Sequence, residues 1–145
     1  MYDFLLLVHV LSAFALLGAT AALWAIVLAT RLARPLLSPV TAALLLRPTT
    51  IVVIVGTLGT LVFGVWLAIY LDDYQLWDGW IVASLVLWLV GTITGERSGR
   101  EYNAAGTTGD PVDASRLWKR GNVLSVISTV AVVAVLVLMI YKPGA

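Results

Sequence analysis

Four long apolar segments, separated by polar stretches, dominate the chain. They cover residues 4–29, 50–71, 77–95 and 122–141. Asp78 is the only Asp, Glu, Lys or Arg within them. About 20 apolar residues are enough for a helix to cross the hydrocarbon core of a bilayer. In lipid, the backbone groups of each segment must bond within the segment, as they do in a helix. The pattern therefore predicts an all-α membrane protein with four transmembrane helices.

The connections between these segments are short, so consecutive helices should be antiparallel neighbours in one up-down bundle that spans residues 1–145. Within the first connection, Ser38 and Pro39 form a typical helix start, and Pro48 should end that helix after fewer than about three turns. Such a helix is too short to span, which predicts a short interfacial helix between spans one and two. Residues 103–113 are rich in Gly, Thr, Ala and Asp and predict a flexible loop.

Composition supports the membrane assignment and indicates an orientation. Hydrophobic residues make up 61% of the chain and charged residues 12%, with a mean hydropathy of +0.99. The net charge of +1, with basic residues confined to loops, argues against a nucleic-acid partner. By the positive-inside rule both termini lie outside, because the loops after spans one and three hold most basic residues. These are Arg31, Arg34, Arg47, Arg97, Arg100, Arg116, Lys119 and Arg120.

Several classes of chemistry are absent from the sequence. There is no cysteine, which excludes disulfides, thiolate metal sites and dithiol redox chemistry. The spans hold no pair of carboxylates, and no Ser-His-Asp set can be assembled. Every Asp and Glu lies at or beyond a span boundary, so a proton-coupled dimeric transporter ranks last among the functions considered.

The first span contains the one histidine of the chain, His9, among leucines, valines and alanines. An ionisable side chain inside a span is costly and often marks a functional site. At helical spacing His9 shares a face with Leu5, Ser12, Ala13 and Leu16, and this face should point into the bundle. Two interpretations remain open: a neutral histidine bonded to a neighbouring helix, or a ligand of a metal.

Small and polar residues mark faces of the other spans. Gly56, Thr60 and Gly64 are four residues apart, which favours a close helix contact and alternatively leaves room for a flat ligand. Ser84 should bond back to its own helix. The fourth span carries three polar residues on one face that should bond to neighbouring helices, and Met139 near its outer end. The three are Asn122, Ser125 and Thr129.

The chain resembles the four-helix membrane superfamily that contains the HemJ-type protoporphyrinogen oxidases and the membrane part of copper-resistance protein D. The resemblance lies in Leu7-Val-His-Val-Leu11, Thr60-Leu-Val-Phe-Gly-Val-Trp-Leu67, Lys119 to Asn122, and Leu138-Met-Ile-Tyr-Lys-Pro143. It implies a multi-pass protein of a bacterial plasma membrane that binds haem b, with His9 as an axial ligand. Because the chain has one histidine, the iron would be five-coordinate, take His9 of a second protomer, or take Met139 as a weak second ligand. The residues implied around the macrocycle are Ser12, Ala13, Gly56, Thr60 and Gly64.

The chain departs from those oxidases at two places. It has Ser84 where they carry a lysine, and Asn122-Val-Leu-Ser125 where they carry Asn-Glu-Xaa-Pro. We therefore do not expect porphyrinogen oxidation, and the sequence predicts a haem-binding, redox-associated membrane protein instead. The alternative is a non-catalytic accessory subunit whose glycine and aromatic surfaces pack against a larger membrane complex. The partners expected besides the bilayer are a second copy in a homodimer or such a complex.

Overall fold

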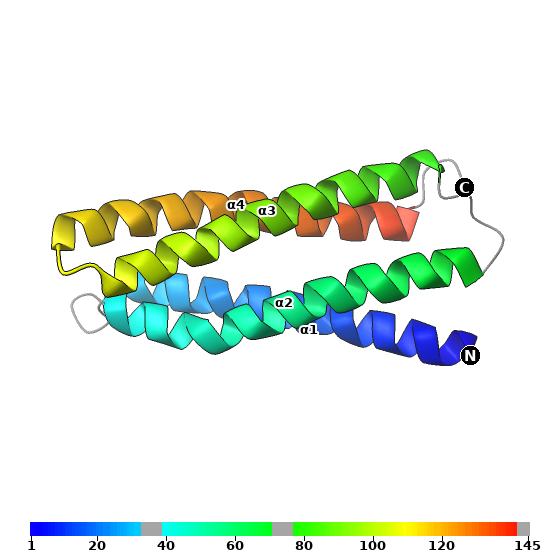
Figure 1. Ribbon diagram of the computed structural model, residues 1–145, viewed down its shortest axis with the longest axis horizontal. Helices are drawn as coiled ribbons and strands as arrows, with labels where there is room; N and C mark the ends of the chain where they lie inside the picture. The colour runs from blue at the N-terminus through cyan, green and yellow to red at the C-terminus, as the bar shows by residue number, and fades with distance from the viewer. Residues whose placement is uncertain (33–38, 71–76, 142–145) are drawn as a thin grey trace.

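The computed structural model of the protein describes residues 1–32, 39–70 and 77–141. These residues form four long helices and no strand, and each helix is long and apolar enough to cross a membrane. The first residue of α1 and the last of α4 lie at the same end of the bundle (Figure 1). An all-α membrane protein of four helices is thus confirmed. The helices are α1 (Tyr2–Leu32), α2 (Pro39–Tyr70), α3 (Gly79–Thr107) and α4 (Pro111–Tyr141).

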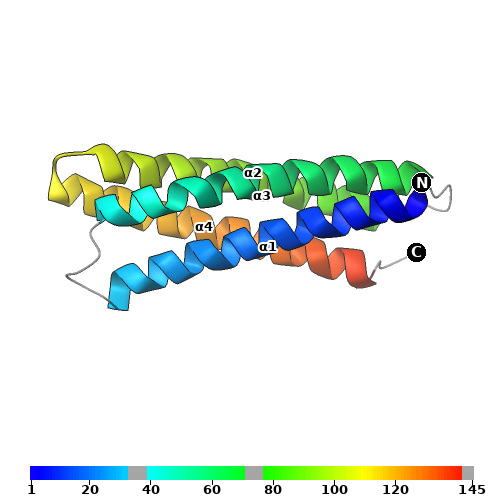
Figure 2. The same cartoon turned by 90° about the horizontal axis from the view of Figure 1, so that it is seen from below.

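The bundle consists of two antiparallel hairpins, α1–α2 and α3–α4. Helices pack closely within each hairpin and much more loosely between the hairpins, where α2 and α3 make most of the contact. Figures 1 and 2 show the two pairs lying along one another. Space between helices is therefore expected where the two hairpins face each other.

All four helices meet in one apolar cluster near the connection between α3 and α4. We call this end of the bundle the inner end, after the orientation that the basic residues predict. Small side chains allow α2 and α3 to touch here, since a Cβ on Gly106 would lie 2.6 Å from the Cβ of Ala43. The cluster, named the inner core below, consists of Val27, Ala42, Leu46, Tyr102, Ala105 and Trp118.

The predicted separate interfacial helix is wrong, because its residues form the first turns of α2. Pro48 lies inside that helix, where proline removes one backbone hydrogen bond and usually breaks or kinks the helix. Buried Ala42 and Leu46 fix the preceding turns in the inner core, and the Thr50 hydroxyl donates to the Leu46 carbonyl across the proline. Tertiary packing therefore outweighs the local helix-breaking preference. Ser38 lies outside the described residues.

The predicted flexible loop at residues 103–113 is also wrong over most of its length. Helix α3 continues to Thr107 and α4 begins at Pro111, which leaves three residues between them. The Asp110 carboxylate accepts a hydrogen bond from the Val112 N–H at 2.8 Å, as an N-cap residue does. Asp110-Pro111 is a helix-start signal, and the buried Ala105 extends α3 into the inner core.

Candidate functional site

His9 is hydrogen-bonded to the neighbouring helix of its own hairpin. Its Nδ1 lies 3.1 Å from the backbone carbonyl oxygen of Thr60 on α2. A carbonyl only accepts, so Nδ1 carries the proton and Nε2 is the nitrogen with a free lone pair. The face shared with His9 points into the bundle as predicted, since Leu5 and Leu16 are buried. The bond to a neighbouring carbonyl is the first of the two interpretations drawn from the sequence, and it leaves Nε2 able to bind a ligand.

The ring of His9 occupies the space beside Gly64. A Cβ at this glycine would lie 2.9 Å from the ring Cε1 and 3.1 Å from Nδ1. Real Cβ atoms essentially never come that close to another heavy atom, so any larger residue here would push the ring aside. The absent side chain of Gly64 therefore lets the imidazole reach the Thr60 carbonyl.

The rest of the span-two stripe packs against α1. A Cβ at Gly56 would lie 2.9 Å from the backbone nitrogen of Leu16, and one at Gly59 would lie 2.3 Å from the Ser12 hydroxyl oxygen. This is the close helix contact that the spacing favours. Gly56 does not leave room for a flat ligand, because α1 covers it.

The larger of two cavities that His9 borders lies between the two hairpins and has a volume of about 760 Å³. All four helices line it, and most of the lining is aliphatic. His9, Ala13 and Thr60 belong to its wall, whereas Ser12 and Gly56 do not. Of the six residues that the resemblance implies for haem binding, counting His9, the structure thus brings three to the large cavity and puts two in the contact between α1 and α2.

A second cavity of about 280 Å³ lies further toward the outer end and includes Gly64, the sixth residue. The two cavities share part of their walls, so His9 and Met139 both face each of them. The shared wall residues are His9, Thr60, Trp88, Val135 and Met139. His9 therefore borders both cavities, together with Met139, the weak candidate for a second ligand.

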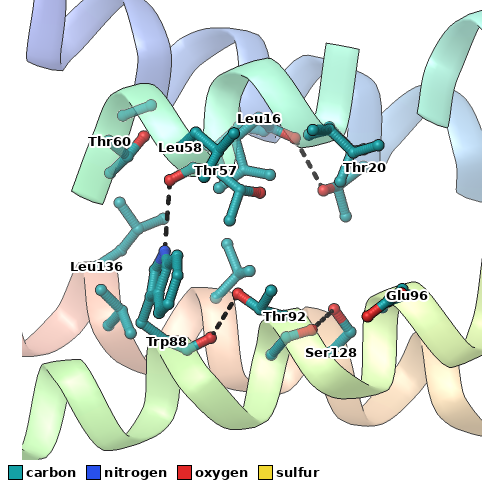
Figure 3. Close-up of a pocket in the computed structure, with 18 of the residues that line it drawn as sticks. Leu16, Thr20, Thr57, Leu58, Thr60, Trp88, Thr92, Glu96, Ser128 and Leu136 are labelled. Atoms are coloured by element: carbon teal, nitrogen blue, oxygen red, sulfur yellow. Dashed lines mark hydrogen bonds between the residues drawn. The ribbon is translucent and has the colours of Figure 1, made fainter. Parts of the chain in front are cut away.

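Two further residues of the cavity wall were missed from the sequence as site residues. The Trp88 indole N–H on α3 donates to the Thr57 carbonyl on α2 at 3.4 Å and links the hairpins (Figure 3). The Thr57 hydroxyl makes no hydrogen bond with any described residue, unlike that of Thr92, which donates to the Trp88 carbonyl.

Glycines of α3 four residues apart, at positions 91, 95 and 99, also line the cavity. Their spacing was the signal that could have located this wall.

The polar face of the fourth span bonds to other helices, as predicted. Asn122 accepts a hydrogen bond from the Tyr102 hydroxyl at 2.8 Å, and Ser125 lies 2.6 Å from the Ser98 hydroxyl. Thr129 accepts from the Trp24 indole of α1 at 2.9 Å. These bonds hold the inner half of the bundle together, including the two hairpins.

Ser84, which stands where the related oxidases have a lysine, donates to the Trp80 carbonyl of its own helix at 2.7 Å. This confirms the predicted back-bond. Among the described residues no three His, Cys, Asp or Glu side chains lie close enough to hold a metal ion. His9 could still ligate the metal of a group that brings further ligands of its own, as a porphyrin does.

The fold and the site define a small polytopic membrane protein with one histidine at a cavity between two helical hairpins. The chain belongs to the DUF2269 family of predicted integral membrane proteins, whose model matches residues 3–143. Neither a curated protein nor a solved structure matches the chain. The family match covers nearly the whole chain and agrees with a single four-helix unit in a membrane.

Proposed function

We propose that the protein binds haem b in the bilayer through His9 and takes part in a redox or haem-handling process. The observation that carries the proposal is the hydrogen bond from His9 Nδ1 to the Thr60 carbonyl. Metal-bound histidines almost always donate their second ring N–H to a carboxylate, carbonyl or water, which fixes the ring and raises the basicity of the ligating nitrogen. His9 has this arrangement, with Nε2 left as the ligating atom.

The surroundings of His9 suit a large apolar cofactor. A volume of about 760 Å³ lies within the range of known ligand sites, and such sites are mostly apolar with a few polar groups. Met139 borders both cavities beside His9 and is the thioether that would serve as a second, weaker ligand. A haem held in this way supplies one-electron chemistry. The resemblance to the HemJ-type and copper-resistance superfamily is a further reason to favour haem b.

The test is an absorption spectrum of the purified protein, oxidised and reduced, after expression with added haem precursor. We expect a Soret band and sharp reduced α and β bands, which His9→Ala abolishes. Ser12→Ala is the matched control, because Ser12 lies one turn away, donates to the Val8 carbonyl and borders neither cavity. Met139→Leu shifts the reduced bands if the thioether is the second ligand. An unchanged spectrum in His9→Ala, or no Soret band at all, would refute the proposal.

An accessory subunit remains the alternative function. It was expected to offer its span-two glycines and its aromatic residues to a partner, but α1 covers Gly56 and Gly59. The exposed aromatic side chains Trp66 and Trp77 are still free for such a role. Blue-native electrophoresis of native membranes separates the two functions, since a band only at the size of a monomer or homodimer argues against a larger complex.

A further inference from the structure

The inter-hairpin cavity is polar at one end. Its inner end is bordered by Glu96, Arg100 and Asn103 of α3, and its body by aliphatic side chains of all four helices. From Trp88, which borders both cavities, to Arg100 the wall runs about 18 Å along α3 by helical rise. A long apolar space that ends beside charged groups fits an elongated amphiphile.

The inner end also offers free hydrogen-bond donors. The Asn103 side chain bonds to none of the residues that the structure describes. Arg100 uses one terminal nitrogen for its ion pair with Glu96, and both partners of that pair are largely exposed. Guanidinium has five N–H donors, so most of them remain for an anion, and arginine is well matched to phosphate.

The cavity wall is open next to these donors. A Cβ built on Gly99 meets no atom within 4 Å, although this glycine borders the cavity one residue before Arg100. Gly91 and Gly95, by contrast, face Ser128 or Ala131 of α4 at 3.0–3.4 Å. The open part of the glycine stripe is thus the part beside the charged residues, where a chain could enter from the inner leaflet.

Charge at the inner end favours an anionic occupant. The basic side chains described there are Arg47, Arg97, Arg100, Arg116, Lys119 and Arg120, and the acidic ones are Glu96, Glu101, Asp110 and Asp113. Six positive and four negative charges leave an excess of two positive charges at this end. Anionic lipids of the cytoplasmic leaflet are attracted to such surfaces by roughly 1 kcal/mol per basic residue.

We propose that the inter-hairpin cavity is a binding site for one anionic phospholipid of the inner leaflet. An acyl chain enters past Gly99 and lies among the aliphatic residues of the cavity, and the phosphate bonds to Arg100 and Asn103. The charged groups lie at the end of the cavity opposite to His9, whereas the acyl chain occupies the body of the cavity that a haem at His9 would also use. The phospholipid is therefore proposed for the haem-free protein.

Native mass spectrometry tests the proposal after reconstitution of the full chain in equal parts of phosphatidylglycerol and phosphatidylcholine and extraction in mild detergent. We expect one phosphatidylglycerol to remain bound in preference to phosphatidylcholine. Arg100→Gln should lower the retained fraction about fivefold, the equivalent of one basic residue. Arg97→Gln is the control, because it removes the same charge from the same helix but does not border the cavity. Glu96→Gln should raise retention by releasing the Arg100 guanidinium.

A filled cavity gives a second, independent test. Gly99→Leu adds a side chain whose Cβ meets no atom within 4 Å, and it replaces a poor helix former with a good one. We expect this variant to fold and to lose the retained phospholipid. Gly18→Leu is the control, since Gly18 also faces open space but lies outside the cavity. Equal loss in Arg97→Gln and Arg100→Gln, full retention in Gly99→Leu, or equal retention of the two lipids would overturn the site. No haem absorbance enters this measurement, so its result is separate from that of the His9 proposal.

Discussion

The contribution of each glycine to helix packing depends on the atoms that face it. Gly64 faces an imidazole, Gly56 faces the backbone of α1, and Gly18 and Gly99 face no atom within 4 Å. In a membrane, small residues let helices approach because no hydrophobic force drives their association. Substitution of each glycine by alanine therefore measures a different contact.

Gly64→Ala should displace the His9 ring from the Thr60 carbonyl, because the new Cβ would lie 2.9 Å from Cε1. Overpacking of this kind typically costs about 1–3 kcal/mol. The ¹⁵N chemical shifts of the single imidazole, measured by NMR in micelles, should lose the signature of an Nδ1–H bonded to a carbonyl. Gly18→Ala is the control and should leave those shifts unchanged. Wild-type shifts in Gly64→Ala would show that the ring does not depend on this glycine.

Tyr102→Phe should reduce stability through lost hydrogen bonds while the ring stays packed. The hydroxyl donates to Asn122 Oδ1 at 2.8 Å and lies 3.1 Å from Ser125 Oγ, and the ring centroid is 4.7 Å from that of Trp118. Net hydrogen bonds are worth about 0.5–1.5 kcal/mol each, so we expect a loss of about 1–2 kcal/mol in the free energy of unfolding. Denaturant titration in micelles measures it. Tyr141→Phe, at a residue that is 78% exposed, should change it little.

At the scale of the helices, the contact of Gly56 on α2 with the backbone of α1 should be the one least tolerant of added volume. A Cβ at Gly56 meets the Leu16 nitrogen at 2.9 Å and the Ser12 carbonyl oxygen at 3.0 Å. Backbone atoms cannot rotate away as a side chain can, so the helices must separate. Gly56→Ala should thus lower the thermal midpoint more than Gly64→Ala, and both more than Gly18→Ala. If Gly56→Ala is as stable as Gly18→Ala, the two helices lie further apart than described.

The sequence predicted the number and type of the elements because apolar length alone determines a membrane span. It failed at Pro48 and at residues 103–113, where local signals were weighed without the inner core. Ala42 and Ala105 look unremarkable in the sequence, yet both are 0% exposed and hold their helices in register. Helix ends outside the lipid depend on such contacts between distant residues, which no local pattern contains.

The candidate site was predicted only as far as one helix determines it. The face of α1 that carries His9 follows from helical spacing, and it does point inward. Its partner, the Thr60 carbonyl, is a backbone atom that every residue possesses, so no residue type marks it. The cavity is a product of two hairpins that pack loosely together, and neither hairpin alone shows it. Haem binding itself stays a prediction.

For the whole molecule, the orientation in the membrane decides which leaflet the cavity opens to, and cysteine labelling can determine it. The chain has no cysteine, so single substitutions give an unambiguous signal. Trp77, 88% exposed, lies at the outer end just before α3, and Gly109 lies in the inner turn between α3 and α4. With both termini outside, a membrane-impermeant maleimide should label Trp77→Cys in intact cells and Gly109→Cys only after permeabilisation.

The reverse labelling pattern would place the basic end of the bundle outside and contradict the positive-inside assignment. It would also move Arg100 and Asn103 to the outer leaflet, so the bound phospholipid would have to come from that leaflet instead of the inner one. Labelling of both positions in intact cells would instead contradict the topology, because Trp77 and Gly109 lie at opposite ends of α3, whose 29 residues span about 43 Å by helical rise. That length exceeds the roughly 30 Å hydrocarbon core, so the two cysteines must face different compartments if α3 crosses the membrane.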